Sequence, residues 1–382
     1  MFKKIHKSLL VILTLLFILP YSSLAQSDTV QEETYYRAEI LEIISEKEII
    51  EDNATNVIQQ DLRVRILTGD RTNQEILVQG ISDITLLNQR PYKTGENVIL
   101  LATSIGDRET YVITDAVRTG PLIFLAILFI AVVIVVGRKR GIRALIVLTA
   151  TMLLIVFFIV PQIISGASPV MISCIAGAII LALAIYGTEG ISPAAHISFT
   201  SILGSLVILT LLSVLFTNAA RLTGLASEDV IFLIGFQDLA INVQGLLLAG
   251  IIIGSLGVLD DTVVSQVSVV RELASTDPKL TQKSLFKKAL RVGIDHITAI
   301  INTLFLAYAG VSLPLLIIFS LNQPPFIDAF TIFNNEIIAT EIVRTLVGSI
   351  ALVLSVPLAT FIAAYYFSRH TPAPSGGHVH MH

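Results

Sequence analysis

Seven long apolar segments follow one another along this chain from Gly120 onward, and they constrain its fold more than any other feature. Each is near the ~20 residues that an α-helix needs to cross about 30 Å of hydrocarbon. Hydrophobic residues make up 54% of the 382 residues and charged residues only 14%, whereas about a quarter of a soluble domain is charged. The sequence therefore predicts a polytopic α-helical membrane protein. The segments are Pro121–Val136, Ala144–Val160, Pro169–Tyr186, Ile197–Phe216, Val243–Val270, Val292–Tyr308 and Thr345–Phe367.

The loops between these segments predict their orientation. RKRGIR at 138–143 has four basic residues and no acid, and RELASTDPKLTQKSLFKKALR at 271–291 has six basic residues against two acids. Loops of this kind stay in the cytoplasm. NQPPFIDAFTIFNNEIIAT at 322–340 has no Lys or Arg. Seven helices place all three loops consistently, with the N-terminal domain outside the cytoplasm and the C-terminus inside.

The first 25 residues have the layout of a secretory signal peptide. MFKKIHK is followed by an apolar run from Leu9 to Leu19 and by Ser23-Leu24-Ala25 before Gln26. A basic start, a short apolar core and a small-x-small site are typical of cleavable export signals. We therefore predict a signal peptide at 1–25 and an exported domain at 26–118.

Residues 26–118 alternate between apolar and polar side chains in five short stretches, of which DLRVRILTG is the clearest. This alternation predicts half-buried β-strands. Five strands in about ninety residues favour a small β-barrel of the OB or SH3-like kind. The segment has seventeen acidic and nine basic residues, a net charge of −8, so nucleic acid is not an expected partner.

The stretch VSLPLLIIFSL at 311–321 is apolar but too short to span a membrane. Gly310 and Pro314 separate it from the helix before. We predict a re-entrant or kinked segment here, because such backbone lies at membrane depth only where protein or a watery cavity covers it. The membrane domain would then extend over 119–369, followed by a disordered His-rich tail at 370–382.

The fifth apolar segment contains the most informative polar residues. In LLLAGIIIGSLGVLDDTVVSQVSVV, the small residues Gly250, Gly254 and Gly257 share one helical face and predict close helix packing. Asp260 and Asp261 follow. They are either an ion or proton site or hydrated acids near a helix end, because charges in hydrocarbon need a partner, a cavity or a role.

Further polar residues lie on three helices. Gln266 would extend a polar stripe from Asp261, and Asp295 and Asn302 share a helical face. An interhelical hydrogen bond and a substrate contact both explain Asn302. Glu341 and Arg344 stand three residues apart, a spacing that predicts an ion pair.

The strings LLLAGIIIGSLGVLDDTVVSQVSVVREL, LFKKALRVGIDHITAIINTLFLAYAGVSLPLLI and EIVRTLVGSIALVLSVPLATFIAAYY resemble, in this order, the YibE/F-like family of bacterial membrane proteins. The resemblance covers about Gly120 to Phe367. It implies a location in the bacterial cytoplasmic membrane, an exported β domain and a multi-helix core. It implies no particular biochemical activity.

Two functions from different classes fit these features. The first is a transporter or channel component for a small solute or ion, with Asp260, Asp261, Gln266, Asp295 and Asn302 as its binding residues. The alternative is an envelope scaffold or assembly protein that binds a partner through 26–118. The sequence lacks the H-E-x-x-H, G-x-S-x-G and P-loop patterns, so we expect no enzyme, metal site or cofactor. The expected interaction partners are the lipid bilayer and either an envelope protein or a second membrane subunit.

Overall fold

The computed structural model describes residues 34–51, 55–81, 91–105, 108–226, 228–235, 241–321 and 328–370. The predicted signal peptide and the tail beyond His370 lie outside these ranges. The described chain divides into two compact units, one ending at Val132 and the other beginning at Val133.

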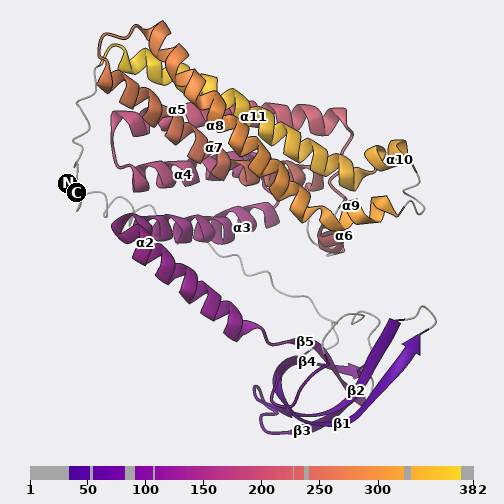
Figure 1. Cartoon of the computed structure of the whole chain (residues 1–382). Helices are drawn as coiled ribbons and strands as arrows, with labels where there is room; N and C mark the ends of the chain where they lie inside the picture. Colours follow the sequence, from indigo (N-terminus) through magenta and orange to yellow (C-terminus); the bar gives the residue numbers. More distant parts are fainter. Residues whose placement is uncertain are drawn as a thin grey trace. The chain divides into compact units, whose positions relative to one another are not determined.

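The smaller unit contains a five-stranded antiparallel sheet in the order β3-β2-β1-β4-β5, which curls into a half-barrel (Figure 1). This sheet confirms the predicted β-rich domain. The edge strands β3 and β5 lie near each other without forming a ladder. The strands are β1 (Thr34–Glu51), β2 (Thr55–Ile66), β3 (Glu75–Ile81), β4 (Asn97–Ile105) and β5 (Arg108–Ala116).

The alternation of side chains explains this sheet. Alternate residues of each strand point to one face and form an apolar core, while their neighbours face outward. The long strand β1 pairs with both β2 and β4 and is therefore the central strand of the sheet. The core consists mainly of Tyr36, Ala38, Ile40, Leu62, Val64, Ile66, Val78, Val98, Leu100 and Ile113.

Two polar contacts hold irregular segments against the sheet. The buried Gln60 side chain accepts a hydrogen bond from the Tyr92 backbone N–H at 2.9 Å, and its amide donates to the Tyr92 carbonyl oxygen at 3.2 Å. Gly69 has a φ of +86° in the turn after β2, and a β-carbon there would lie 2.8 Å from the Tyr36 ring. Glycine is therefore required at this turn.

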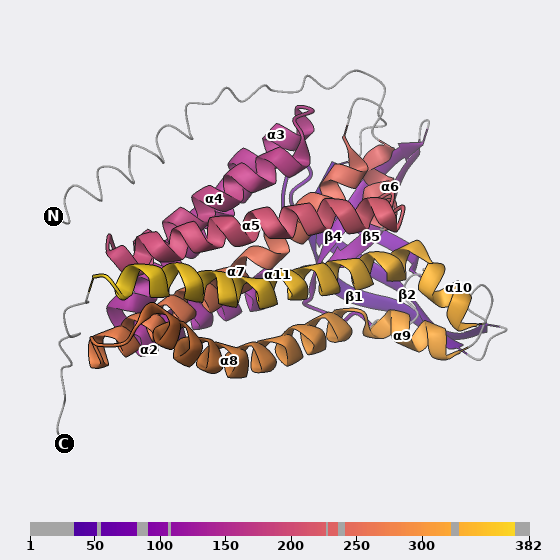
Figure 2. The ribbon, with the colours of Figure 1, turned by 90° about the horizontal axis from the view of Figure 1, so that it is seen from above.

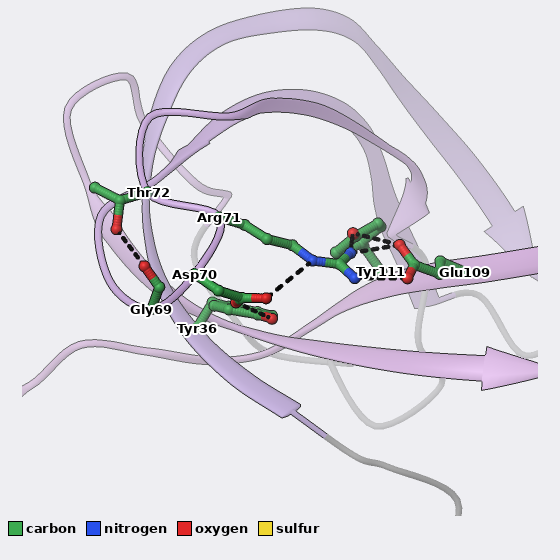
Figure 3. Close-up of polar contacts among 7 residues, drawn as sticks. All are labelled: Tyr36, Gly69, Asp70, Arg71, Thr72, Glu109 and Tyr111. Atoms are coloured by element: carbon green, nitrogen blue, oxygen red, sulfur yellow. Dashed lines mark hydrogen bonds and ion pairs between the residues drawn. The ribbon is translucent and has the colours of Figure 1, made fainter.

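An arginine bridges the two edges of the half-barrel (Figure 3). Arg71, before β3, binds both carboxylate oxygens of Glu109 on β5, with 2.6 Å between Nη2 and Oε1, and it also contacts the Tyr111 hydroxyl. Hydrogen bonds from Arg71 and Tyr111 lower the pKa of Glu109 to about 2. Tyr36 donates to Asp70 at 2.9 Å beside this contact. Bidentate pairs of this kind are stronger than single charged contacts.

Six helices in the described ranges are long and apolar enough to cross a membrane. The longest apolar region, Thr119–Ile164, has 46 residues, which as one straight helix would measure about 69 Å. It joins α2 (Thr119–Leu154), a π-helical turn (Ile155–Ile159) and α3 (Val160–Ile164). Two of the seven predicted segments lie in it.

The backbone of α2 is broken at Arg138, where φ is 49° and ψ is −128°. A β-carbon on Gly141 would lie 2.1 Å from the carbonyl oxygen of Val133. Eight residues of continuous helix would separate these two positions by about 12 Å. The chain therefore turns back on itself here, and the turn needs glycine at residue 141.

The other helices form a bundle around α7, as Figures 1 and 2 show. α7 packs against α4, α5, α8 and α11, and α11 also packs against α5 and α8. The long members are α4 (Pro169–Thr188), α5 (Pro193–Ala219), α7 (Val243–Thr276), α8 (Gln282–Val311) and α11 (Glu336–Phe367). The short ones are α6 (Glu228–Ile234), α9 (Leu313–Ser320) and α10 (Ala329–Asn334).

The segment predicted to re-enter or kink becomes α9, which has eight residues and none of them buried. α8 ends at Val311, and α9 starts with Pro314 in its first turn. A helix of this length measures about 12 Å, less than half of a bilayer core. Its re-entrant placement stays a prediction.

Candidate functional site

α7 positions most of the candidate residues because it is the central helix of the bundle. Half of its most apolar window is buried, although the 34 residues of α7 include two aspartates and two glutamines. Its side chains at different angles around the axis meet different neighbours. The polar residues of α7 therefore lie in separate environments.

Asp260 and Asp261 point to different sides of α7. Asp260 is partly buried, and its Oδ1 atom is enclosed without a hydrogen-bond partner among the described residues. Asp261 is exposed. One residue turns a helix by about 100°, so the two carboxylates leave the helix in directions about 100° apart.

Gly250, Gly254 and Gly257 lie on the exposed face of α7 that also contains Asp261. No described atom comes within 4 Å of the place where a β-carbon would be on any of the three. Within the described chain, no helix makes the close approach that these glycines would allow. Their packing role stays a prediction.

Gln266 is buried where three helices meet. Its amide nitrogen donates to the Ala289 carbonyl oxygen of α8 at 3.0 Å and to the Thr360 hydroxyl of α11 at 2.7 Å. Gly293 of α8 lies beside it, where a β-carbon would be 2.7 Å from the Gln266 carbonyl oxygen Oε1. Gln266 therefore joins α7, α8 and α11 and does not share the exposed face of Asp261.

A small pocket lies between the same three helices, near the middle of α7 and α11 and toward the C-terminal end of α8. Ser255, Tyr308 and Ser349 supply its hydroxyl groups, and Gly348 brings α11 close to Ser255, whose Oγ would lie 3.1 Å from a β-carbon at residue 348. Apolar side chains complete the walls. These are Val258, Leu259, Leu304 and Leu352.

The two candidate residues of α8 lie away from this pocket. Asp295 and Asn302 are exposed, whereas Leu285, Ala289, Gly293 and Ile297 form the buried face of α8. None of Asp260, Asp261, Asp295 and Asn302 lines the pocket. The structure therefore brings together Gln266 with its partners on two helices, but it does not join the four acidic and amide residues in one site.

Glu341 and Arg344 form an ion pair along α11, with 2.9 Å between Oε1 and Nη1. About a third of the Arg344 side chain is exposed, and its Nε is enclosed without an acceptor in the described chain. The contact is local to one helix. It anchors Arg344 without linking α11 to another helix.

Sequence reasoning missed the residues that build the three-helix contacts, among them Ser255, Gly293, Tyr308, Gly348 and Thr360. Their signal was small and hydroxyl side chains within apolar helices, which often mark helix–helix interfaces in membranes. In the described ranges, no group of three or more His, Cys, Asp or Glu side chains could hold a metal ion.

Long apolar helices around a central, partly polar α7, together with a β-sheet domain before them, define a multi-pass membrane protein of bundle type. The family model described as YibE/F-like protein matches residues 125–369. The chain therefore belongs to the YibE/F-like family, which confirms the resemblance in its three helical strings. No curated protein and no solved structure matches the chain.

Proposed function

We propose that this protein is a non-enzymatic transporter or channel component for a small solute or ion in a bacterial cytoplasmic membrane. The observation that carries the proposal is the Asp260 carboxylate, half-way along the central helix, with one oxygen enclosed and without a hydrogen-bond donor in the described chain. Ionisable groups in membrane helices are costly and usually serve a pathway. Asp260 is the acid for which packing offers no other explanation.

The proposed arrangement has seven spanning helices, with the reversal at Arg138 and Gly141 dividing the first apolar region in two. It places the basic residues of the reversal in the cytoplasm and the β-sheet domain, an OB-like half-barrel, on the other side of the membrane. The C-terminus would be cytoplasmic. Reporter fusions after Arg118 and after Arg369 should then give opposite locations.

Flux into proteoliposomes tests the transport proposal. The purified chain should move at least one of protons, alkali cations and small anions, and Asp260→Asn should lower the rate at least tenfold. Asp277→Asn removes an exposed carboxylate just beyond the same helix and serves as the matched control. No flux across this panel, or equal loss in both variants, would contradict the proposal.

A second candidate, an envelope scaffold, has one observation in its favour. Tyr35, Leu101 and Val112 form a row of paired residues across β1, β4 and β5, and Tyr35 is 60% exposed and Val112 42% exposed. An apolar row on the outer face of a sheet fits a protein partner. Photo-crosslinking from Tyr35 should then capture one defined envelope protein, and Tyr35→Asp should abolish that product.

A further inference from the structure

The first turns of α8 present three basic residues on the side turned away from the bundle. Lys283, Lys287 and Arg291 follow one another at intervals of four residues and are all exposed. We call these three residues the basic stripe. The buried residues Leu285 and Ala289 each lie two residues after a stripe lysine. Two residues turn a helix by about 200°, so the stripe lies opposite the face of α8 that packs against α7 and α11.

The described chain offers the basic stripe no partner. None of its three side chains forms an ion pair or a hydrogen bond with another described residue. The first turn of α8 contains no acid. Lys283 lies in that turn, where the positive end of the helix dipole disfavours a cation. The charges of the stripe are therefore available to an anion from outside the chain.

The face of the basic stripe becomes apolar further along α8. Ile294 follows Lys287 by seven residues and Phe305 follows Ile294 by eleven, which are close to two and three whole turns of helix. Ile294 is 53% exposed and Phe305 is 65% exposed. A spanning helix whose outer face changes from cations to apolar side chains passes there from the headgroups into the hydrocarbon. The stripe therefore lies at the level of the headgroups.

The contacts between α8 and α11 extend this level to a second helix. A β-carbon on Gly293 would touch Val356, and four residues earlier on α8 the Ala289 carbonyl shares the Gln266 amide with Thr360. The residue numbers fall on α8 while they rise on α11, so the two helices are antiparallel. The basic stripe is therefore level with the last turns of α11.

The last turns of α11 have the side chains of a membrane–water interface. Tyr365 is 47% exposed, and the Arg369 guanidinium carbon lies 3.8 Å from the centre of its ring. Tyrosines are enriched where a membrane meets water, because an apolar ring and a polar tip suit that depth. This second helix supports the headgroup level independently of the basic stripe.

We propose that the basic stripe binds the headgroups of anionic phospholipids in the leaflet at this end of the bundle. Its three cations lie within about 12 Å along the helix, and cations at this depth attract anionic lipids. Such a lipid supplies a negative headgroup for the stripe and an acyl chain for Ile294 and Phe305. A soluble anion would leave the apolar part of the same face uncovered.

Fluorescence quenching in reconstituted bilayers tests the site. The chain contains no tryptophan, so Ile294→Trp introduces a single reporter beside the stripe. Brominated phosphatidylglycerol should bind there about fivefold more tightly than brominated phosphatidylcholine. Lys283→Gln, Lys287→Gln and Arg291→Gln together should remove this preference. Leu211→Trp, at an exposed position of α5, should report no preference.

A matched variant separates the stripe from net charge. Arg37→Gln, Lys47→Gln and Lys93→Gln remove three cations from exposed positions of the β-sheet domain and should leave the preference unchanged. Exchanging lysine and arginine within the stripe should keep it as well. Equal quenching by both lipids beside the unchanged stripe, or a preference that survives the triple substitution there, would overturn the proposal. Displacement of phosphatidylglycerol by inorganic phosphate at constant ionic strength would also contradict it, because a soluble anion would then be the ligand. No readout depends on flux.

Discussion

Gly293 of α8 lies against Gln266 of α7 so closely that a β-carbon at residue 293 would be 2.7 Å from Gln266 Oε1 and 2.6 Å from the Val356 Cγ1 of α11. The close packing of α7, α8 and α11 at this point therefore depends on the absence of a side chain at residue 293. Because Gln266 is tied to Ala289 and Thr360 by hydrogen bonds, it has little freedom to move aside.

Gly293→Ala should destabilise the bundle by about 1 to 3 kcal/mol, the usual cost of overpacking. Thermal unfolding in detergent, followed by far-UV circular dichroism, should show a lower Tm. Gly310→Ala on the same helix is the control, since nothing lies within 4 Å of its β-carbon position, and it should leave the Tm unchanged or slightly higher. A Gly293→Ala variant as stable as Gly310→Ala would show that Gln266 can relocate.

The Arg71–Glu109 pair predicts how acid affects the β-sheet domain. Hydrogen bonds from Arg71 lower the pKa of Glu109 from its ordinary 4.5 to about 2. The carboxylate therefore contributes stability in full above about pH 4.5, and this contribution is lost as the pH falls toward 2. Urea unfolding of residues 26–118 should show a steeper loss of stability over this range in wild type than in Glu109→Gln. Parallel pH profiles would be inconsistent with the pair.

Glu336, in the first turn of α11, holds the turn between α5 and α6. Its Oε1 accepts from the Thr223 backbone N–H at 2.6 Å, from the Thr223 hydroxyl at 2.7 Å and from the Gly224 N–H at 3.0 Å. Glu336→Ala should speed hydrogen–deuterium exchange of the Thr223 and Gly224 amides several-fold, since both lose their acceptor. Asp328→Ala, which removes the cap of α10 instead, should leave these two amides unchanged.

The β-sheet and the helices were predictable where a local pattern decides the structure. Leu62, Val64 and Ile66 alternate with arginines, and this period of two both predicts a strand and selects the residues of the core. Apolar length likewise predicts the helices of a membrane protein. The family could also be recognised, because its motifs are contiguous strings.

The environment of a polar residue on α7 was not predictable in the same way. Gln266 follows Asp261 by five residues, which turns a helix by about 500°, or 140° beyond a full turn. The two therefore face different sides, and only the positions of α8 and α11 decide that Gln266 is buried. The pocket around Ser255 depends on the register of three helices, which no single segment contains.

The half-barrel has a seam between β3 and β5 where neither strand completes a ladder with the other. Unpaired strand edges are sites at which foreign strands add and aggregates grow. The ion pair between Arg71 and Glu109 crosses this seam. A strand from another molecule could pair there only by separating Arg71 from Glu109 and burying both charges. The ion pair that links the two edges of the domain therefore also disfavours aggregation through these edges.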